Sequence, residues 1–359
     1  MMKQDKTVLV TGAAGFIGGR VVERLHFDGL ANGRAGVHRW SSAARISRIP
    51  VDILKFDVLD KDNLPHVIDG SDFIVHCAYG DRSVTKEGTR NLLQAALDAG
   101  VERFVHLSTV EVYGNVSGQI DESMPMKYSG NPYADSKIEA EKACIEFRRK
   151  GLSVVILRPT IVYGPFSKLW SVRSVQLLHS GWGNITGLNG ICNHLYVDDL
   201  VSAIILSLFN KSADNETFNI SGLDPVTWAE FFDRFSSTIG LPLHKPKSFW
   251  QAYFRAYTIS PVRKVARQIM NTHPEVVLTT TSRWPLLKGI ARYTEKQIRS
   301  TPSAGELALY KRNAVYSIDK AKSSLGYLPK FDLNRGLQLN AAWLRHHGYL
   351  HTDNGDYRE

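Results

Sequence analysis

The sequence predicts a doubly wound parallel α/β fold that carries a smaller, mixed α/β lobe. A β-branched run at residues 7–11 stops at a glycine turn and continues as an apolar segment with helical spacing at 16–27. Strand-like and helix-like segments then alternate as far as about residue 150, which specifies a parallel sheet covered by helices. The length of 359 residues, 43% of them hydrophobic, suffices for a large core and an appended lobe.

The glycine turn reads Gly12-Ala13-Ala14-Gly15-Phe16-Ile17-Gly18. Gly12 permits a tight turn, Gly15 lets the backbone approach a pyrophosphate, and Gly18 allows the helix to pack closely on its strand. Free N–H groups at the start of the helix favour an anion. We therefore predict a dinucleotide site formed by Gly12, Gly15, Phe16, Ile17 and Gly18, and a βα turn without a nucleotide is the alternative.

A second strand, around residues 35–39, is expected to end beside the adenosine ribose. NAD-binding proteins usually carry an acidic residue there, but here Arg39 follows and no acid is in reach. An arginine suits a 2′-phosphate, so NADP is favoured, with NAD possible. Alternatively, Arg39 stacks on adenine and either cofactor binds. A third strand, at 52–56, would bring Asp57 and Val58 against the adenine edge.

The alternation continues with strands at 71–77 and 103–107 and helices at 85–99 and 133–149. Ligands of such sheets bind at the carboxyl ends of the strands. We therefore assign Ala78, which follows the strand at 71–77, to the cofactor site.

Candidate catalytic residues occur in two segments that the sheet would bring together. Thr109 leaves the carboxyl end of the strand at 103–107, and the four-residue spacing of Tyr133 and Lys137 puts both on one helix face. The Lys137 ammonium and a nicotinamide's positive charge would favour phenolate at Tyr133, making it a proton donor and acceptor for an alcohol–carbonyl pair. Thr109 would hold the substrate oxygen and Lys137 the nicotinamide ribose. A solvated surface pair is the alternative for Tyr133 and Lys137.

These motifs resemble, in type and order, those of extended short-chain dehydrogenases/reductases, and specifically the NAD-dependent epimerase/dehydratase family. The resemblance covers about residues 6–240, with a weaker echo at 316–343. It is carried by TGAAGFIG at 11–18, EGTRNLL at 87–93, STVEVYG at 108–114, YADSK at 133–137, LRPTIVYGP at 157–165 and YVDD at 196–199. It implies a Rossmann-type fold, catalytic positions for Thr109, Tyr133 and Lys137, and nicotinamide contacts for Pro159 and Val162.

The resemblance further implies hydride transfer at a carbinol or keto carbon of a sugar nucleotide, as in a 4-keto-sugar reductase or epimerase of glycan biosynthesis. The dTDP-glucose 4,6-dehydratases carry Asp-Glu after the threonine, whereas this chain has Val110-Glu111, which argues against dehydration. UDP-galactose 4-epimerases have an asparagine where Ile161 stands and a diphosphate-binding arginine where Cys192 aligns. A sugar diphosphate would therefore need other cations.

Two other functions stay open. The segment at 157–165 and the long insertion also resemble 3β-hydroxysteroid dehydrogenases and dihydroflavonol reductases, which act on apolar alcohols or ketones. A cofactor-bound regulator without turnover is the remote alternative. His76 and His194 lie near the expected site, but a histidine at a strand end is usually a hydrogen-bonded structural residue, so neither is given a catalytic role.

The net charge of +9 is concentrated in one insertion, because residues 245–312 hold thirteen lysines and arginines against three acids, an excess of ten. Arg255, Arg263, Lys264 and Arg267 flank apolar stripes at 249–257 and 262–270. Three roles are possible: an interfacial helix on an anionic membrane, a clamp for a substrate diphosphate, or the solvated face of an ordinary lobe.

The expected organisation is a dinucleotide-binding domain at 1–165, rejoined by 196–220, a substrate lobe at 166–195 and 221–315, and a closing segment at 316–359. We expect a cytoplasmic, globular homodimer, peripheral to the membrane if the insertion docks there. Its partner would be a small, anionic substrate rather than a nucleic acid. No metal site is expected, because Cys77, Cys144 and Cys192 lack metal-ligand spacing. The charged start Lys3-Gln4-Asp5-Lys6 does not resemble a signal peptide.

Overall fold

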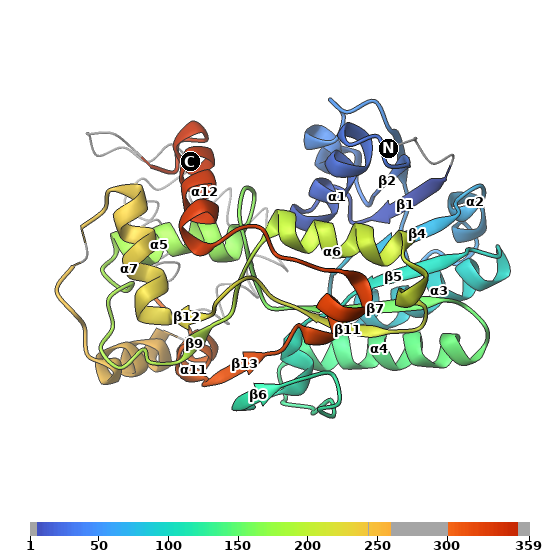
Figure 1. Cartoon of the computed structure of the whole chain (residues 1–359). Helices are drawn as coiled ribbons and strands as arrows, with labels where there is room; N and C mark the ends of the chain where they lie inside the picture. Colours follow the sequence, from blue (N-terminus) through green and yellow to red (C-terminus); the bar gives the residue numbers. More distant parts are fainter. Residues whose placement is uncertain (1–5, 243, 260–300, 351–359) are drawn as a thin grey trace, which may run out of the picture. The chain divides into compact units, whose positions relative to one another are not determined.

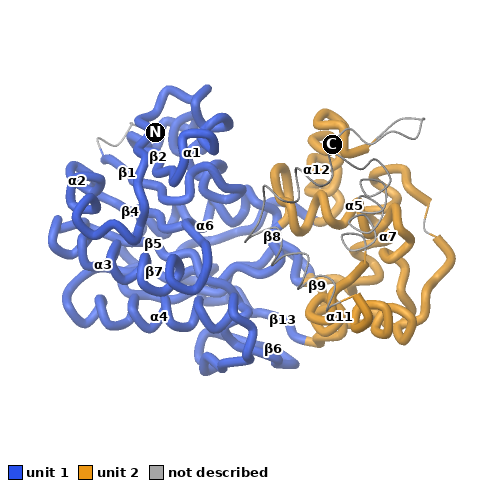
Figure 2. The backbone as a smooth tube through the Cα atoms, turned by 180° about the vertical axis from the view of Figure 1, so that it is seen from behind, with its two compact units in different colours: residues 1–162, 193–224, 314–332 blue, residues 163–192, 225–313, 333–359 orange. Residues whose placement is uncertain are grey.

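The computed structural model describes residues 6–242, 244–259 and 301–350 (Figure 1). The chain divides into two compact units (Figure 2). Unit 1 comprises residues 1–162, 193–224 and 314–332, and unit 2 comprises 163–192, 225–313 and 333–359. The segment expected as one closing element at 316–359 is thus divided after residue 332.

Unit 1 is built on a seven-stranded parallel sheet with the order β11-β7-β5-β4-β1-β2-β3, which confirms the predicted doubly wound fold. The chain runs from β1 out to β3 and returns to β4 on the other side of β1. The direction of winding therefore reverses between β1 and β4, where sheets of this kind bind ligands. The strands are β1 (Thr7–Thr11), β2 (Asn32–Val37), β3 (Asp52–Lys55), β4 (Phe73–His76), β5 (Arg103–Leu107), β7 (Val154–Pro159) and β11 (Thr217–Ile220).

The register of the central strands aligns their carboxyl ends. Thr11 is paired with Gly36 on β2 and with His76 on β4, and His76 is paired with His106 on β5. The segments that leave β1, β4 and β5 therefore start side by side at one edge of the sheet.

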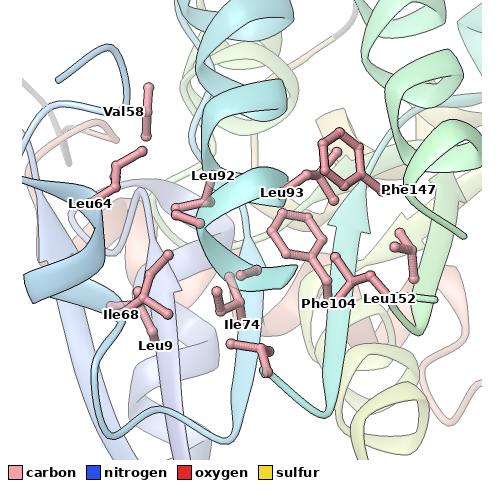
Figure 3. Packing of buried hydrophobic residues seen from close by; sticks show 14 of the residues in the cluster. Leu9, Val58, Leu64, Ile68, Ile74, Leu92, Leu93, Phe104, Phe147 and Leu152 are labelled. Atoms are coloured by element: carbon pink, nitrogen blue, oxygen red, sulfur yellow. The ribbon is translucent and has the colours of Figure 1, made fainter. Parts of the chain in front are cut away.

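Helices pack on this sheet through a buried apolar core (Figure 3). Leu9, Ile74 and Phe104 from the strands meet Leu93 of α3 and Phe147 of α4, and each is at most 1% exposed. Full burial of such a side chain stabilises the fold by about 1.5–3 kcal/mol. The helices of unit 1 are α1 (Phe16–Phe27), α2 (Leu64–Ile68), α3 (Thr89–Asp98), α4 (Pro132–Arg149) and α6 (Val197–Phe209).

Short ladders and single helical turns complete the described chain. The short strands pair as β6 with β13, β8 with β10 and β9 with β12. Their bounds are β6 (Gly118–Ile120), β8 (Ile161–Tyr163), β9 (Ile191–Cys192), β10 (His194–Tyr196), β12 (Val226–Thr227) and β13 (Ala314–Tyr316). The helical turns are η1 (Trp40–Arg45), η2 (Val84–Gly88), η3 (Val110–Tyr113), η4 (Lys168–Val172), η5 (Lys211–Ala213) and η6 (Ala321–Leu325).

Asp198 and Asp199 lie in the first turn of α6 but do not cap it. The N-cap is Tyr196, and no side chain caps this helix. Asp198 instead accepts a hydrogen bond from Arg20 of α1 at 2.5 Å, and Asp199 accepts the backbone N–H groups of Lys330 and Phe331. The two carboxylates therefore join elements that are distant in the sequence, which local spacing could not indicate.

Unit 2 is mainly helical and has an aromatic core. Trp228 of α7 is fully buried, and its ring centroid lies 4.6 Å from that of Tyr310 on α11. Arg173 of α5 forms an ion pair with Glu306 of α11, which also closes a capping box with Ser303. The named helices of this unit are α5 (Arg173–His179), α7 (Trp228–Ile239), α11 (Ala304–Lys311) and α12 (Leu333–His346).

Residues 249–259 are also helical, but their aromatic side chains do not form the interior. Ala252 and Ala256 are buried, whereas Trp250 is 74% and Phe254 71% exposed. If the insertion is an ordinary lobe, most rings of this stripe are therefore not its core, because the small residues face inward. The second stripe, at 262–270, lies outside the described residues.

Candidate active site

The glycine turn has the geometry that its sequence predicts. Gly12 has a φ of +66°, and a Cβ there would come within 2.8 Å of the backbone nitrogen of Ala78. A Cβ on Gly18 would collide with the carbonyl oxygen of Gly12. Gly15 is the N-cap of α1 and provides no side-chain cap. The turn therefore offers close backbone access and a helix N-terminus to an anion, which fits a dinucleotide pyrophosphate.

A buried hydrogen-bond chain connects this turn to β4 and α3. The Thr89 hydroxyl donates to the carbonyl of Thr85 at 2.5 Å, so it accepts from Nε2–H of His76 at 3.0 Å. Burial lowers the pKa of His76 to about 3, so its other ring nitrogen, Nδ1, accepts from the Thr11 hydroxyl at 2.7 Å. Thr11 in turn accepts the backbone N–H of Ala78 at 3.2 Å. His76 is thus the hydrogen-bonded structural histidine that the sequence indicated, and it fixes the turn beside Ala78.

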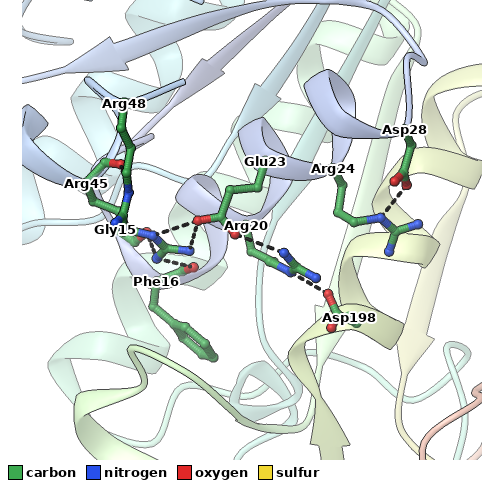
Figure 4. A network of polar contacts seen from close by, with 9 residues as sticks. All are labelled: Gly15, Phe16, Arg20, Glu23, Arg24, Asp28, Arg45, Arg48 and Asp198. Atoms are coloured by element: carbon green, nitrogen blue, oxygen red, sulfur yellow. Dashed lines mark hydrogen bonds and ion pairs between the residues drawn. The ribbon is translucent and has the colours of Figure 1, made fainter. Parts of the chain in front are cut away.

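The predicted ribose end of the site is rich in cations. β2 ends at Val37, earlier than expected, and Arg39 lies two residues beyond it with an exposed side chain. Arg45 is more enclosed: it donates to Glu23 at 2.8 and 3.0 Å and to the carbonyls of Gly15 and Phe16 at 3.4 Å (Figure 4). Arg45 therefore sits against the glycine turn, whereas Arg39 points to solvent.

Asp57 and Val58 follow β3, as predicted. The Asp57 carboxylate lies 3.4 Å from Nε2 of His38 and accepts the backbone N–H of Leu59. Val58 is buried, and its carbonyl accepts a hydrogen bond from Asn91 of α3. Asp57 is thus next to the segment that carries Arg39, while the Val58 side chain packs inward.

Thr109, Tyr133 and Lys137 come together, as their motifs predict. Thr109 caps η3 just beyond β5 and accepts the backbone N–H of Glu111 at 3.2 Å. The Thr109 side chain lies close enough to the Tyr133 phenol to lower its pKa. Lys137, one turn further along α4, donates from Nζ to the carbonyl of Leu107 at 2.6 Å. The alternative of a solvated surface pair does not hold for Lys137, which is 5% exposed.

Burial controls the protonation of this pair. Burial raises the pKa of Tyr133 to about 12, although the Thr109 side chain opposes the shift. Burial also lowers the pKa of Lys137 to about 8. In the chain alone Tyr133 is therefore a neutral phenol, and the phenolate expected from the sequence requires additional positive charge near its oxygen.

A buried polar network that sequence reasoning missed lies beneath the pair. Glu141 is fully buried and follows Lys137 by one turn on the same face of α4. Arg158 of β7 donates to both of its carboxylate oxygens, at 2.6 to 3.2 Å, and Ser108, the residue before Thr109, donates to one of them. Arg158 also donates to the Tyr113 hydroxyl at 2.8 Å. The network thus ties the helix of Tyr133 to the strand end of Thr109, and the spacing of Tyr133, Lys137 and Glu141 was the signal for it.

Three further residues complete the described surroundings. Pro159 ends β7, and Val162 is 7% exposed in β8. Tyr79, which the sequence left without a role, touches the catalytic pair: its ring centroid lies 5.1 Å from that of Tyr133 and 5.8 Å from Nζ of Lys137.

Two features are absent from the described ranges. No group of three or more His, Cys, Asp or Glu side chains is arranged to hold a metal ion in the described part of the chain. None of the described helices combines the length and hydropathy needed to cross a bilayer.

Comparisons with known proteins give one family match and several similar proteins. Residues 8–221 match the model of the NAD dependent epimerase/dehydratase family. UDP-glucose 4-epimerase of Vibrio cholerae is 29% identical over 278 residues, which cover 69% of this chain and 80% of that protein. 2-Alkyl-3-oxoalkanoate reductase of Shewanella oneidensis is 23% identical over 93% of this chain and 85% of that protein. The structure of UDP-glucuronic acid 4-epimerase from Bacillus cereus, in complex with UDP-glucuronic acid and NAD, superposes with a TM-score of 0.69 at 19% identity and covers 95% of this chain and 99% of that one.

Proposed function

Because the chain belongs to the NAD dependent epimerase/dehydratase family, we propose that it is a reductase or epimerase that acts at a carbinol or keto carbon of a sugar nucleotide. The observation that carries this proposal is the meeting of Thr109, Tyr133 and Lys137 at the sheet edge that also bears the glycine turn. A nicotinamide dinucleotide, when bound, supplies reversible hydride transfer. The turn at Gly12, Gly15, Phe16, Ile17 and Gly18 would hold its pyrophosphate.

The side chains have separate roles in this reaction. Thr109 would hold the substrate oxygen by a hydrogen bond, next to the phenol of Tyr133. Tyr133 would give a proton to that oxygen in reduction and take it back in oxidation. Lys137, fixed by the Leu107 carbonyl, would bind the nicotinamide ribose and favour the ionised phenol through its charge.

A Tyr133→Phe variant tests this assignment. It removes the proton donor but keeps the ring that packs against Tyr79. We expect a loss of most turnover, with dinucleotide affinity unchanged when measured by titration of nicotinamide fluorescence. Unchanged turnover would refute the catalytic role of Tyr133.

A second candidate function is the oxidation or reduction of an apolar alcohol or ketone. It is favoured by the length over which the chain matches 2-alkyl-3-oxoalkanoate reductase. It is also favoured by Ile161 and Cys192, where a diphosphate-binding enzyme would use polar residues. Both side chains are buried. Binding of UDP, UDP-glucose and a long-chain β-keto acid, compared in one titration series, separates the two functions.

For the cofactor, NADP is the specific proposal. The exposed Arg39 beyond β2 supports it, since its guanidinium is available to a 2′-phosphate. Arg39→Ala should weaken NADPH binding and leave NADH binding unchanged. Equal weakening of both would instead indicate a contact with adenine.

Two further proposals concern the role of residues 249–270 and the oligomeric state. The outward-facing Trp250 and Phe254 support contact of this segment with an anionic membrane. The other two roles, a clamp for the substrate diphosphate and the solvated face of a lobe, stay as alternatives. A variant with Arg263, Lys264 and Arg267 changed to Glu distinguishes these roles through its co-sedimentation with anionic vesicles and its KM. The three positions lie outside the described residues. The proposed homodimer is checked by light scattering.

A further inference from the structure

Tyr79 lies where the cofactor turn and the catalytic pair meet. It follows Ala78, whose backbone is so close to Gly12 that a Cβ on that glycine would overlap it. Its ring lies edge-on to Tyr133, with the ring planes at 82°, and the Lys137 ammonium lies over its face. The ring therefore contacts both members of the pair directly.

The remainder of the Tyr79 side chain is open. Tyr79 is 55% exposed, and among the exposed large apolar side chains of the described residues it alone has a ring contact with the catalytic pair. Its hydroxyl has no hydrogen-bond partner within the part of the chain that the structure describes. Burial of the ring raises the pKa of the Tyr79 phenol, so at neutral pH this hydroxyl is a hydrogen-bond donor.

The loop that carries Tyr79 is held in place from both sides. Before it, the N–H of Ala78 is bound by Thr11. After it, Asp81 accepts the backbone N–H groups of Val84 and Thr85, each at 3.0 Å, through its side chain and its carbonyl respectively. Such anchoring fixes an exposed ring before a ligand arrives, which reduces the entropy lost on binding.

We propose that Tyr79 is the substrate-facing wall of the active site, against which the sugar ring of the nucleotide sugar rests. This inference depends on the proposed function. A pyranose presents apolar C–H groups and hydroxyls together, and a tyrosine offers an apolar face and a polar tip to both. Because the ring of Tyr79 touches Tyr133, a sugar resting on it has its reacting carbon beside the phenol of Tyr133. Tyr79 is therefore a specificity-determining residue for the sugar and not for the nucleotide.

Three variants and three kinds of ligand test this role. Tyr79→Ala removes the ring, and Tyr79→Phe removes only the hydroxyl. Tyr128→Ala is the matched control, because Tyr128 is 49% exposed and also packs on a lysine of α4, Lys142, but is not in contact with the catalytic pair in the described chain. Each protein is titrated calorimetrically with NADP and with NAD and, in the presence of the dinucleotide that binds, with UDP and with UDP-glucose or dTDP-glucose. Circular dichroism verifies that each variant is folded.

We expect Tyr79→Ala to weaken binding of the sugar nucleotides about tenfold, and Tyr79→Phe about threefold, with UDP and NAD unchanged. Tyr128→Ala should bind every ligand as the wild type does. Equal losses for UDP and UDP-glucose, a loss for NAD, or no loss at all would overturn the role of Tyr79 while leaving the proposed function intact. If the wild type binds neither sugar nucleotide, the proposed function fails and this inference fails with it.

Discussion

Glu141 and Arg158 form a buried ion pair, so we expect the effects of substituting them on the unfolding free energy to be strongly coupled. The carboxylate is fully buried and the guanidinium is 6% exposed, and each also binds a hydroxyl, that of Ser108 or of Tyr113. Arg158→Met would leave the carboxylate with Ser108 as its remaining partner, and Glu141→Leu would leave the guanidinium with Tyr113. Loss of one partner of a buried pair costs about 3–5 kcal/mol.

The double variant Glu141→Leu, Arg158→Met removes both charges. It leaves the hydroxyls of Ser108 and Tyr113 without their ionic partners, at about 1 kcal/mol each. We therefore expect it to lose about 2 kcal/mol of unfolding free energy, far less than the sum of about 6–10 kcal/mol for the single variants. Urea unfolding followed by circular dichroism measures each value.

A matched control is the exposed ion pair between α3 and α4. Arg90 and Glu146 form a similar two-bonded pair, but their side chains are 49% and 39% exposed. Arg90→Met should cost less than about 1 kcal/mol, because exposed pairs are screened by water. Additive losses in the double variant, or equal losses for Arg158→Met and Arg90→Met, would refute the reasoning.

Two further predictions concern pH. Burial lowers the pKa of Lys137 from 10.5 to about 8, so the unfolded chain binds its proton more tightly and wild-type stability should rise as the pH goes from 8 to 10.5. Lys137→Met should abolish turnover, remove this rise in stability and increase the unfolding free energy at pH 7 by up to about 3 kcal/mol. Urea unfolding at pH 8 and at pH 10.5 measures the rise. The same rise in the variant as in the wild type would contradict the prediction. Burial lowers the pKa of His76 to about 3, so stability that is present above pH 6.5 should be lost as the pH falls toward 3. His76→Leu should reduce this loss of stability at acid pH. If the wild type and the variant lose stability equally between pH 6.5 and 3, His76 is not its source.

The sheet and the catalytic pair could be predicted because their signals are local. The expected bounds of α1 and β5 coincide with those observed, since apolar spacing and flanking glycines define such elements within a few residues. The spacing of Tyr133 and Lys137 likewise fixes their shared face. By contrast, the spacing places Glu141 on the face of Tyr133 and Lys137 but does not identify its partners, which are Arg158 of β7 and Ser108 just beyond β5.

The exposed aromatic helix at 249–259 shows the limit of apolar periodicity. The stripe correctly indicated a helix, but periodicity gives the direction of an apolar face relative to the helix and not to the protein. Ala252 and Ala256, on the other face, are the buried ones. Small residues permit close approach of a helix to its support, so they compete with large rings for the inward position.

The charge state of Tyr133 was beyond sequence reasoning for a different reason. The lysine at the fourth position predicted an easily ionised phenol, yet burial outweighs it and raises the pKa to about 12. Burial also lowers the pKa of Lys137 to about 8, so this side chain begins to lose its positive charge just above neutral pH. Both shifts depend on how far the side chains are removed from water, which the spacing of two residues does not encode. The same desolvation that suppresses the phenolate in the chain alone strengthens the effect of any positive charge that enters the site, since the local dielectric is low. A positive charge bound beside Tyr133, such as that of an oxidised nicotinamide, would therefore lower the pKa of the phenol and favour the ionised form that accepts a proton.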